Sequence, residues 1–349
     1  MSKRLAASLL VVGMILVACA GEETTSATGG DTPESIRVVT HDSFAAGVND
    51  DTFAGFTAET GIEVEVFPAG DAGAMVNQLV LTKDDPIGDV VFGVDDTFLS
   101  RALEADVFTV HESKHLPDVD PSLQLDPEHR VTPIDFGDVC INYDKAEVSI
   151  PPSSLDDLLT EDWTGTLVVE NPATSSPGLA FLLATIAEYG DPGFEEYWQG
   201  LVANGVEVVG DWDTAYYASF TRYGGERPLV VSYASSPPAE VVFAEEPLSE
   251  APTGVMLDGC YRQIEFAGVL EGTGREGPAG QLVDFMLSPE FQAQIPLTWF
   301  VFPANTTVEL PPEFVDHTTL PEAPASVDAA EIDTNRERWI ETWTDIVLG

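Results

Sequence analysis

The order of strand-like and helix-like segments is the feature that most constrains the fold of this chain. Three short apolar runs, residues 36–40, 62–67 and 89–92, are each followed by a polar or glycine-containing turn and then by a helix-like stretch. This alternation is typical of βαβ units, which build parallel sheets in α/β proteins. The turns then gather at one edge of the sheet, where the first residues of helices expose backbone N–H groups suited to anions.

Two long extended runs, residues 131–145 and 260–270, interrupt this alternation. We interpret them as crossings between two α/β lobes, with a ligand cleft that closes by a hinge motion. A chain of 349 residues is long enough to form two such cores. The predicted parts are a signal peptide (1–18), a flexible tether (19–35), a first lobe (36–134), a second lobe (135–262) and a return to the first lobe with C-terminal helices (263–349).

The N-terminus has the features of a lipoprotein signal peptide. Lys3 and Arg4 precede an apolar run over residues 5–17, which is too short to span a bilayer comfortably, and a small residue precedes Cys19. Cleavage there would leave Cys19 as the lipidated first residue, whereas the alternative is a plain secretory signal with an incidental cysteine. The stretch 20–35 is polar and cannot pack a core. We therefore expect a monomer held to a membrane by its lipid, in the periplasm or at the cell surface.

The charge of the chain excludes one class of partner. There are 60 Asp and Glu residues against 14 Lys and Arg, which gives a formal net charge of −46. A nucleic-acid partner is excluded because phosphate backbones need a basic protein face. A cationic ligand is compatible with this charge, although most of the carboxylates are expected to be solvated surface groups.

Cysteine and nucleophile patterns give little sign of metal or catalytic chemistry. Cys140 and Cys260 remain after lipidation of Cys19 and could form one disulfide or stay free. Free thiols are slightly favoured, since each cysteine lies in or beside an apolar run. There is no C-x-x-C pair and no G-x-S-x-G elbow. We expect a binding protein with no metal and no catalytic residue.

The stretch 211–237 contains two candidate ligand-binding aromatics, Trp212 and Tyr233. Aromatic residues at helical spacing predict a helix from Trp212 through Arg222, and residues 229–231 predict a buried strand that leads to Tyr233. Both rings then lie near element ends, where α/β sheets bind their ligands. Ordinary core aromatics would give the same pattern.

Five segments of the chain, in their order and spacing, resemble those of ABC-transporter periplasmic solute-binding proteins, and within that group the thiamine-binding proteins. They are T-H-D-S-F (40–44), D-V-V-F-G-V-D (89–95), N-P-A-T-S-S-P-G-L (171–179), V-S-Y-A-S-S-P (231–237) and I-P-L-T-W-F-V-F-P (295–303). The resemblance covers the chain from about residue 36 to the C-terminal helix. It implies a two-lobed type II fold, no cofactor, and thiamine, thiamine monophosphate or thiamine diphosphate as the ligand. It also implies an ABC permease and ATPase as partners.

The resemblance further implies which residues surround the ligand. Trp212, Tyr233 and Trp299 match aromatic positions of the family. Gly70 and Asp71 match a polar loop that faces the ligand.

The end of the site that would hold a phosphate is implied in the same way, with Ser175 and Ser176 matching the segment that the family uses there. Three positions depart from the family: His41 replaces Tyr, Ala72 replaces Gly, and Ala239 replaces a further Tyr. These departures leave room for a related cationic heterocycle.

The chemistry of thiamine suits these residue types. Its thiazolium ring carries a fixed positive charge, which aromatic faces and carboxylates stabilise. Asp71 or Asp95 could supply the carboxylate. The alternative for Asp95, and for the two serines, is a helix cap.

Three other functions remain open. A ferric-ion-binding protein of the same fold could use Tyr216, Tyr217 and His41, although adjacent residues of a helix point about 100° apart. A polyamine-binding protein would also suit the acidic charge. A lipid-anchored hydrolase would need a nucleophile and a base.

Overall fold

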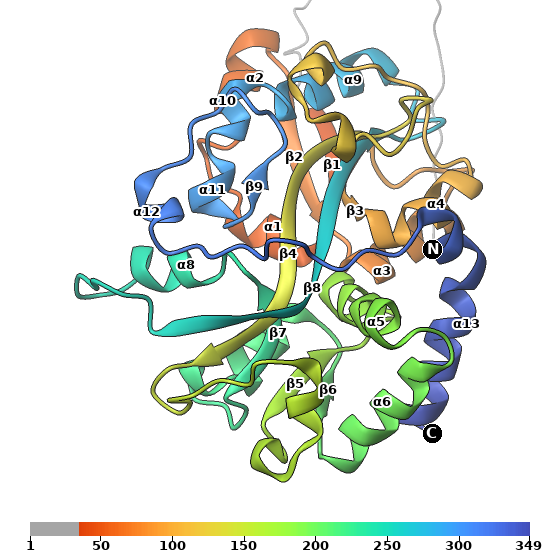
Figure 1. Ribbon diagram of the computed structural model, residues 1–349. Coiled ribbons are helices and arrows are strands. Elements are labelled where there is room, and N and C mark those ends of the chain that lie inside the picture. The colour runs from red at the N-terminus through yellow and green to blue at the C-terminus, as the bar shows by residue number, and fades with distance from the viewer. Residues whose placement is uncertain (1–34) are drawn as a thin grey trace, which may run out of the picture. The chain divides into compact units, whose positions relative to one another are not determined.

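The computed structural model describes residues 35–349, so the predicted signal peptide, Cys19 and nearly all of the tether lie outside the described residues. The strands are β1 (Ser35–Thr40), β2 (Glu63–Pro68), β3 (Val90–Asp95), β4 (Thr132–Asp144), β5 (Leu167–Glu170), β6 (Glu207–Val209), β7 (Leu229–Tyr233), β8 (Thr253–Val269) and β9 (Phe302–Pro303). They form one mixed sheet with the order β2-β1-β3-β8-β4-β7-β5-β6, and β9 pairs with β4 (Figure 1).

Helices cover this sheet. They are α1 (Asp42–Gly47), α2 (Ala54–Thr60), α3 (Ala72–Leu81), α4 (Asp96–Glu104), α5 (Ser176–Tyr189), α6 (Gly193–Ala203), α7 (Trp212–Thr214), α8 (Pro237–Val242), α9 (Glu276–Met286), α10 (Pro289–Gln292), α11 (Ile295–Thr298), α12 (Pro312–Val315) and α13 (Ala329–Val347). Across residues 35–349, no helix is both long and apolar enough to cross a membrane.

The predicted strand–turn–helix units at the start of the chain are confirmed. β1 pairs in parallel with β2 on one side and with β3 on the other. The short helix α1, which was not predicted, occupies the first turn. His41, Asp71 and Asp95 each accept a hydrogen bond from a backbone N–H of the helix that follows. These caps hold three candidate side chains at the carboxyl ends of parallel strands.

The two predicted extended runs are the long strands β4 and β8. They pair antiparallel with each other, while β8 also pairs with β3 and β4 also pairs with β7. In Figure 1 both strands run from the group β1, β2 and β3 to the group β5, β6 and β7. This arrangement gives the predicted two-lobed α/β fold. The predicted lobe boundaries, after residues 134 and 262, fall inside these strands and stay a prediction.

The C-terminal helix α13 packs against helices of both groups of strands, α4 and α6. Trp343 meets the ring of Trp198 edge-on, with 5.5 Å between ring centroids. On the other side, the guanidinium of Arg336 lies 5.9 Å from the centre of the Phe98 ring. Trp339 and Trp343 of α13 are fully buried, and the helix packs against both α4 and α6, so it joins the two.

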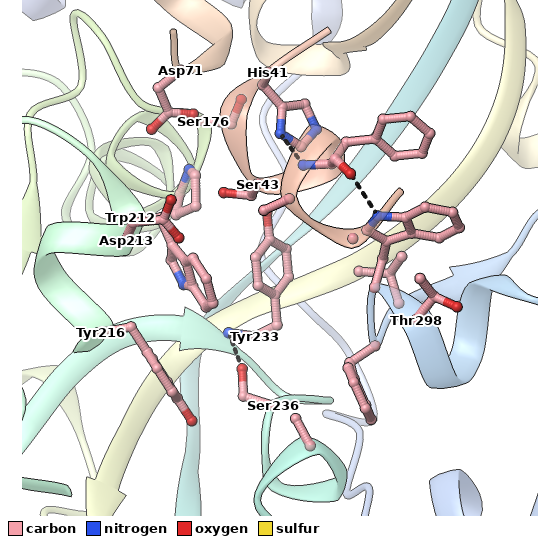
Figure 2. A pocket seen from close by; sticks show the side chains of 18 of the residues that line it. His41, Ser43, Asp71, Ser176, Trp212, Asp213, Tyr216, Tyr233, Ser236 and Thr298 are labelled. Carbon is pink, nitrogen blue, oxygen red and sulfur yellow. Dashed lines mark hydrogen bonds between the residues drawn. The ribbon is translucent and has the colours of Figure 1, made fainter. Parts of the chain in front are cut away.

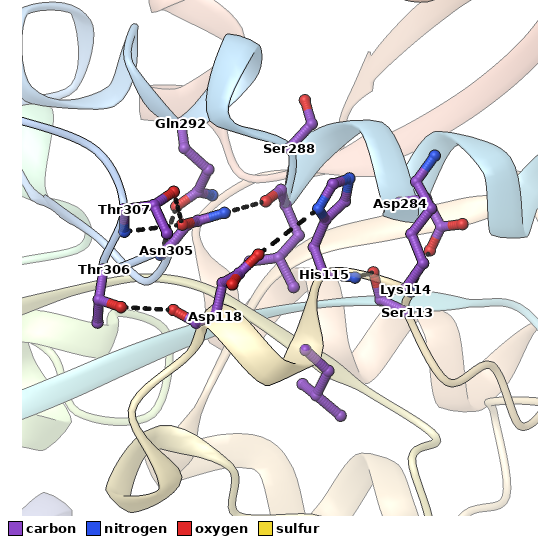
Figure 3. Close-up of polar contacts among 12 residues, drawn as sticks. Ser113, Lys114, His115, Asp118, Asp284, Ser288, Gln292, Asn305, Thr306 and Thr307 are labelled. Atoms are coloured by element: carbon purple, nitrogen blue, oxygen red, sulfur yellow. Dashed lines mark hydrogen bonds and ion pairs between the residues drawn. The ribbon is translucent and has the colours of Figure 1, made fainter.

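Two buried amide side chains fix the segment that carries Trp299. Gln292 donates to the carbonyl of Ile134 at 2.8 Å and accepts from the backbone N–H of Asn305 at 2.9 Å. Asn305 in turn donates to the carbonyl of Leu287 at 2.9 Å (Figure 3). Because buried amides are costly to leave unpaired, this network holds both ends of the segment against β4 and α9.

Cys140 on β4 and Cys260 on β8 form a disulfide. The slight preference for free thiols was therefore wrong. The two cysteines are 120 residues apart in the sequence, and the antiparallel pairing of β4 with β8 brings their Cα atoms to 4.3 Å. Apolar residues beside a cysteine indicate that it is buried, but they do not distinguish a disulfide from a free thiol.

Reduction of this disulfide should lower the free energy of unfolding by about 2–4 kcal/mol, because the bond closes a long loop in the unfolded chain. Thermal unfolding with and without a reductant measures the effect. The double variant Cys140→Ser, Cys260→Ser should be equally unstable in both conditions. An unfolding temperature of the natural protein that does not change with reductant would contradict the prediction.

Candidate functional site

A cavity of about 310 Å³ opens where the strand ends of the two groups meet, a size suited to a small ligand. Figure 2 shows that side chains from both groups point into it. His41 and Asp71 follow β1 and β2, Trp212 lies in α7, Tyr233 ends β7 and Trp299 ends α11. The structure thus brings together predicted residues that are widely separated in the sequence.

Trp212 forms one wall with a fixed orientation. Its indole N–H donates to the hydroxyl of Ser232 at 3.0 Å. The ring stacks on Tyr216 with 5.0 Å between centroids, and Tyr217 meets it edge-on at 5.5 Å. Because the ring is anchored without a ligand, its stacking surface needs little ordering when a ligand binds.

The predicted helix from Trp212 through Arg222 is wrong beyond its first turn. α7 is followed by a π-helical turn over Ala215–Ser219, and the backbone is extended at Phe220. Phe220 is fully buried there, and Thr221 donates its backbone N–H to Arg227. The burial of Phe220 and the hydrogen bond to Arg227 stabilise this extended backbone in place of the expected helix. Tertiary contacts have therefore overridden the local periodicity.

Tyr233 forms a second wall. A Cβ at Gly137 on β4 would lie 2.8 Å from Tyr233 Cδ1, so glycine at this position lets the ring approach the strand. The phenol donates to Gln263 Oε1 at 3.2 Å.

Trp299 both lines the cavity and packs in the core. Its indole N–H donates to the carbonyl of Phe44 at 3.0 Å. The ring stacks on Phe44 at 4.6 Å and on Phe291 at 5.8 Å between centroids. Trp299 is therefore held in place by packing against two other aromatic rings.

The residues predicted for the phosphate end are only partly in the cavity. Ser176 lines it and donates its hydroxyl to Asp95. Ser175 starts α5 without a side-chain cap, and its buried hydroxyl has no hydrogen-bond partner of ordinary geometry. Gly70, Ser175 and Asp95 do not line the cavity.

Asp71 does line the cavity and also caps α3, where it accepts from the backbone N–H of Ala72 at 2.9 Å. Burial raises its pKa, and His41 and this cap oppose the rise. The three positions that depart from the resembling family, His41, Ala72 and Ala239, all line the cavity.

Sequence reasoning missed three carboxylates of the lining: Asp213 in α7, Asp135 on β4 and Glu265 on β8. The last two lie on the long crossing strands. They face each other as cross-strand partners. Glu265 Oε1 lies 3.3 Å from His41 Nε2. The available signal was an acid between two large apolar residues in each crossing run, in the sequences I-D-F and I-E-F.

The comparison with protein families decides the class. The model of the bacterial extracellular solute-binding proteins matches residues 85–335. The chain belongs to this family. It is 30% identical over 312 residues to the thiamine-binding periplasmic protein of Escherichia coli (strain K12), which covers 88% of this chain and 92% of the relative. These findings confirm the predicted relationship.

Solved structures of similar shape agree with the fold. One, a periplasmic thiamin binding protein, has a TM-score of 0.80 and 27% identity, covering 91% of this chain and 98% of its own. A ferric binding protein from Campylobacter jejuni has a TM-score of 0.71 and 20% identity, covering 89% of this chain and 99% of its own. The second likeness concerns the fold alone.

An H-E-x-x-H pattern, which was expected to be absent, occurs at residues 111–115. The zinc sites with this pattern place both histidines on one face of a helix, but these residues are not helical. His111 instead pairs with Asp284 at 3.0 Å. Figure 3 shows His115, which lies 3.9 Å from Asp118. In the part of the chain that the structure describes, no cluster of three or more His, Cys, Asp or Glu side chains could hold a metal ion.

The empty solute-binding protein should become less stable as pH rises from about 4 to above 6. Burial raises the pKa of Asp95 to about 6, although hydrogen bonds from Ser176 and Thr97 lower it. In this interval the unfolded carboxyl loses its proton while the folded one keeps it, so the stability from Asp95 is lost as pH passes through the folded pKa.

Between these pH values, Asp95→Asn should reduce the change in the free energy of unfolding by about 2 kcal/mol. Urea unfolding of both proteins at several pH values measures it. The same slope in both proteins would show that Asp95 does not titrate in this interval.

Proposed function

We propose that this protein binds thiamine outside the cytoplasmic membrane and delivers it to an ABC importer. The observation that carries the proposal is the convergence of Trp212, Tyr233 and Trp299 with carboxylates in one cavity. Aromatic faces and carboxylates are the groups that stabilise a thiazolium cation. The relatives and the solved structure named for thiamine binding support the same ligand.

The proposal extends to the site and its setting. We propose His41, Asp71 and Ser176 as further contacts, with Gly70, Asp95 and Ser175 supporting the loops behind them. The protein would be a monomer anchored through a lipid on Cys19, and its partners would be the permease and ATPase of the importer.

The form of thiamine is part of the proposal. Among the described residues, the cavity lining contains Asp71, Asp135, Asp213 and Glu265 but no Lys or Arg. A phosphate would depend on backbone N–H groups at the starts of α3 and α5. We therefore propose thiamine as the preferred form, with thiamine monophosphate and thiamine diphosphate binding more weakly.

Calorimetric and tryptophan-fluorescence titrations of the purified protein test the proposal. The ligands are thiamine, its two phosphates, spermidine and ferric citrate. Submicromolar binding of thiamine is the expected result. A response to ferric citrate or spermidine, without a response to any form of thiamine, would overturn the ligand while leaving the family unchanged.

A further inference from the structure

Three carboxylates lie side by side across the middle of the sheet. Glu265 of β8 is the register partner of Asp95 on β3 and of Asp135 on β4. Residues in register on neighbouring strands point to the same face of a sheet. Glu265 therefore lies between two other acids, and both Glu265 and Asp135 reach the cavity.

His41 lies beside Glu265. Its Nδ1 accepts the backbone N–H of Phe44 at 3.2 Å, so Nδ1 carries no proton in this arrangement. The proton then lies on Nε2, which is 3.3 Å from Glu265 Oε1. Although burial lowers the pKa of His41, Glu265 and nearby aspartates raise it above the usual value. A second proton on the ring would still cost the bond to Phe44.

Asp135 is a buried neighbour of Glu265. Its residue is 3% exposed, and its Oδ1 has no hydrogen-bond partner although it lines the cavity. Burial raises its pKa well above the usual value, and Glu265 raises it further as a charge and as a hydrogen-bond acceptor. Glu265 therefore reaches the cavity with His41 on one side and the buried Asp135 on the other.

We propose that Glu265 is the counter-ion for the positive charge of the ligand. The protein then selects its ligand by positive charge as well as by the shape of the rings. The inference rests on the proposed function and names a residue that determines specificity. The phenol of Tyr233 lies near Glu265. It donates a hydrogen bond to Gln263, which is two residues from Glu265 and therefore on the same face of β8. An aromatic face and a carboxylate therefore meet at one point of the cavity.

Among the described residues, the cavity lining contains no Lys or Arg that could neutralise Glu265. The groups that face it are Asp95 on β3, Asp135 on β4, Tyr233 on β7 and His41 after β1. Arg262 lies close in sequence but is bonded bidentately to Asp138, at 2.8 and 2.9 Å. A buried charge that its own protein leaves unbalanced is stabilised by a ligand of opposite charge.

The experiment compares ligands of matched shape and different charge. Thiamine and pyrithiamine carry a cationic ring, whereas deazathiamine has a neutral thiophene in place of the thiazolium. Calorimetry on the natural protein should show both cations binding at least about tenfold more tightly than deazathiamine. Equal affinities for thiamine and deazathiamine would overturn the inference and leave the proposed function intact. The failure of all three ligands would overturn the proposed function and the inference that rests on it.

Glu265→Gln tests the residue itself. Gln keeps an acceptor for His41, so the fold should persist, while the preference for the cations over deazathiamine should fall about tenfold. The matched control is Glu63→Gln, which removes the same charge from an exposed position at the start of β2 and should keep the preference. The inference would be overturned if Glu265→Gln kept the full preference for the cations over deazathiamine. It would also be overturned if Glu63→Gln lost as much of this preference as Glu265→Gln.

Discussion

Replacement of Trp212 by alanine should weaken thiamine binding about a hundredfold, which corresponds to about 2.7 kcal/mol. The indole is held by Ser232 and stacked on Tyr216, so it offers a preorganised aromatic surface to the ligand. Its loss removes both the buried apolar contact and the cation–π contact with the thiazolium ring. Calorimetric titration of the natural and variant proteins measures the change.

The control for Trp212 is the variant Trp212→Phe. Phenylalanine can still stack on Tyr216 but has no N–H for Ser232, so the loss should be about tenfold rather than a hundredfold. Unfolding curves should show similar stability for both variants, because Trp212 is only partly buried. A Trp212→Ala protein that folds and binds thiamine with unchanged affinity would remove Trp212 from the site.

The fold could be predicted because its signals are local or repeat along the chain. Strand, turn and helix alternate from residue 36, and the caps at Asp71 and Asp95 lie where the strands were expected to end. The two crossings were recognisable because β4 and β8 are longer than any other strand. The disulfide could not be predicted, since it depends on the register between these two strands.

The site was predicted where a side chain lies at an element end. Trp212, Tyr233, Trp299, Asp71 and His41 occupy such ends, and the structure brings them to one cavity.

Asp135 and Glu265 were missed because they lie in the middle of long strands. A strand reveals which face a side chain takes only once its neighbours are known. The same limit applies to the π-helical turn over Ala215–Ser219, whose spacing in the sequence is indistinguishable from that of an α-helix. Conversely, the H-E-x-x-H pattern at residues 111–115 is present without the helix that gives it meaning.

Glu240 on α8 is the buried group whose removal should cost the most stability. Its residue is 4% exposed. One carboxylate oxygen accepts from the phenols of Tyr216 and Tyr223, both at 2.9 Å, and the other accepts from Arg222 Nε at 2.9 Å. The side chain thus holds together the turn that follows Trp212.

Glu240→Ala should lower the free energy of unfolding by about 3 kcal/mol, measured by urea denaturation. The two phenols would lose their acceptor, and Arg222 would lose its ion pair, which counts for less because Arg222 is 35% exposed. Glu240→Gln keeps one acceptor oxygen and should cost about half as much. Since Tyr216 supports the ring of Trp212, Glu240→Ala should also weaken thiamine binding. A loss of unfolding free energy below about 1 kcal/mol would contradict the prediction, because it would show that water replaces these hydrogen bonds without cost.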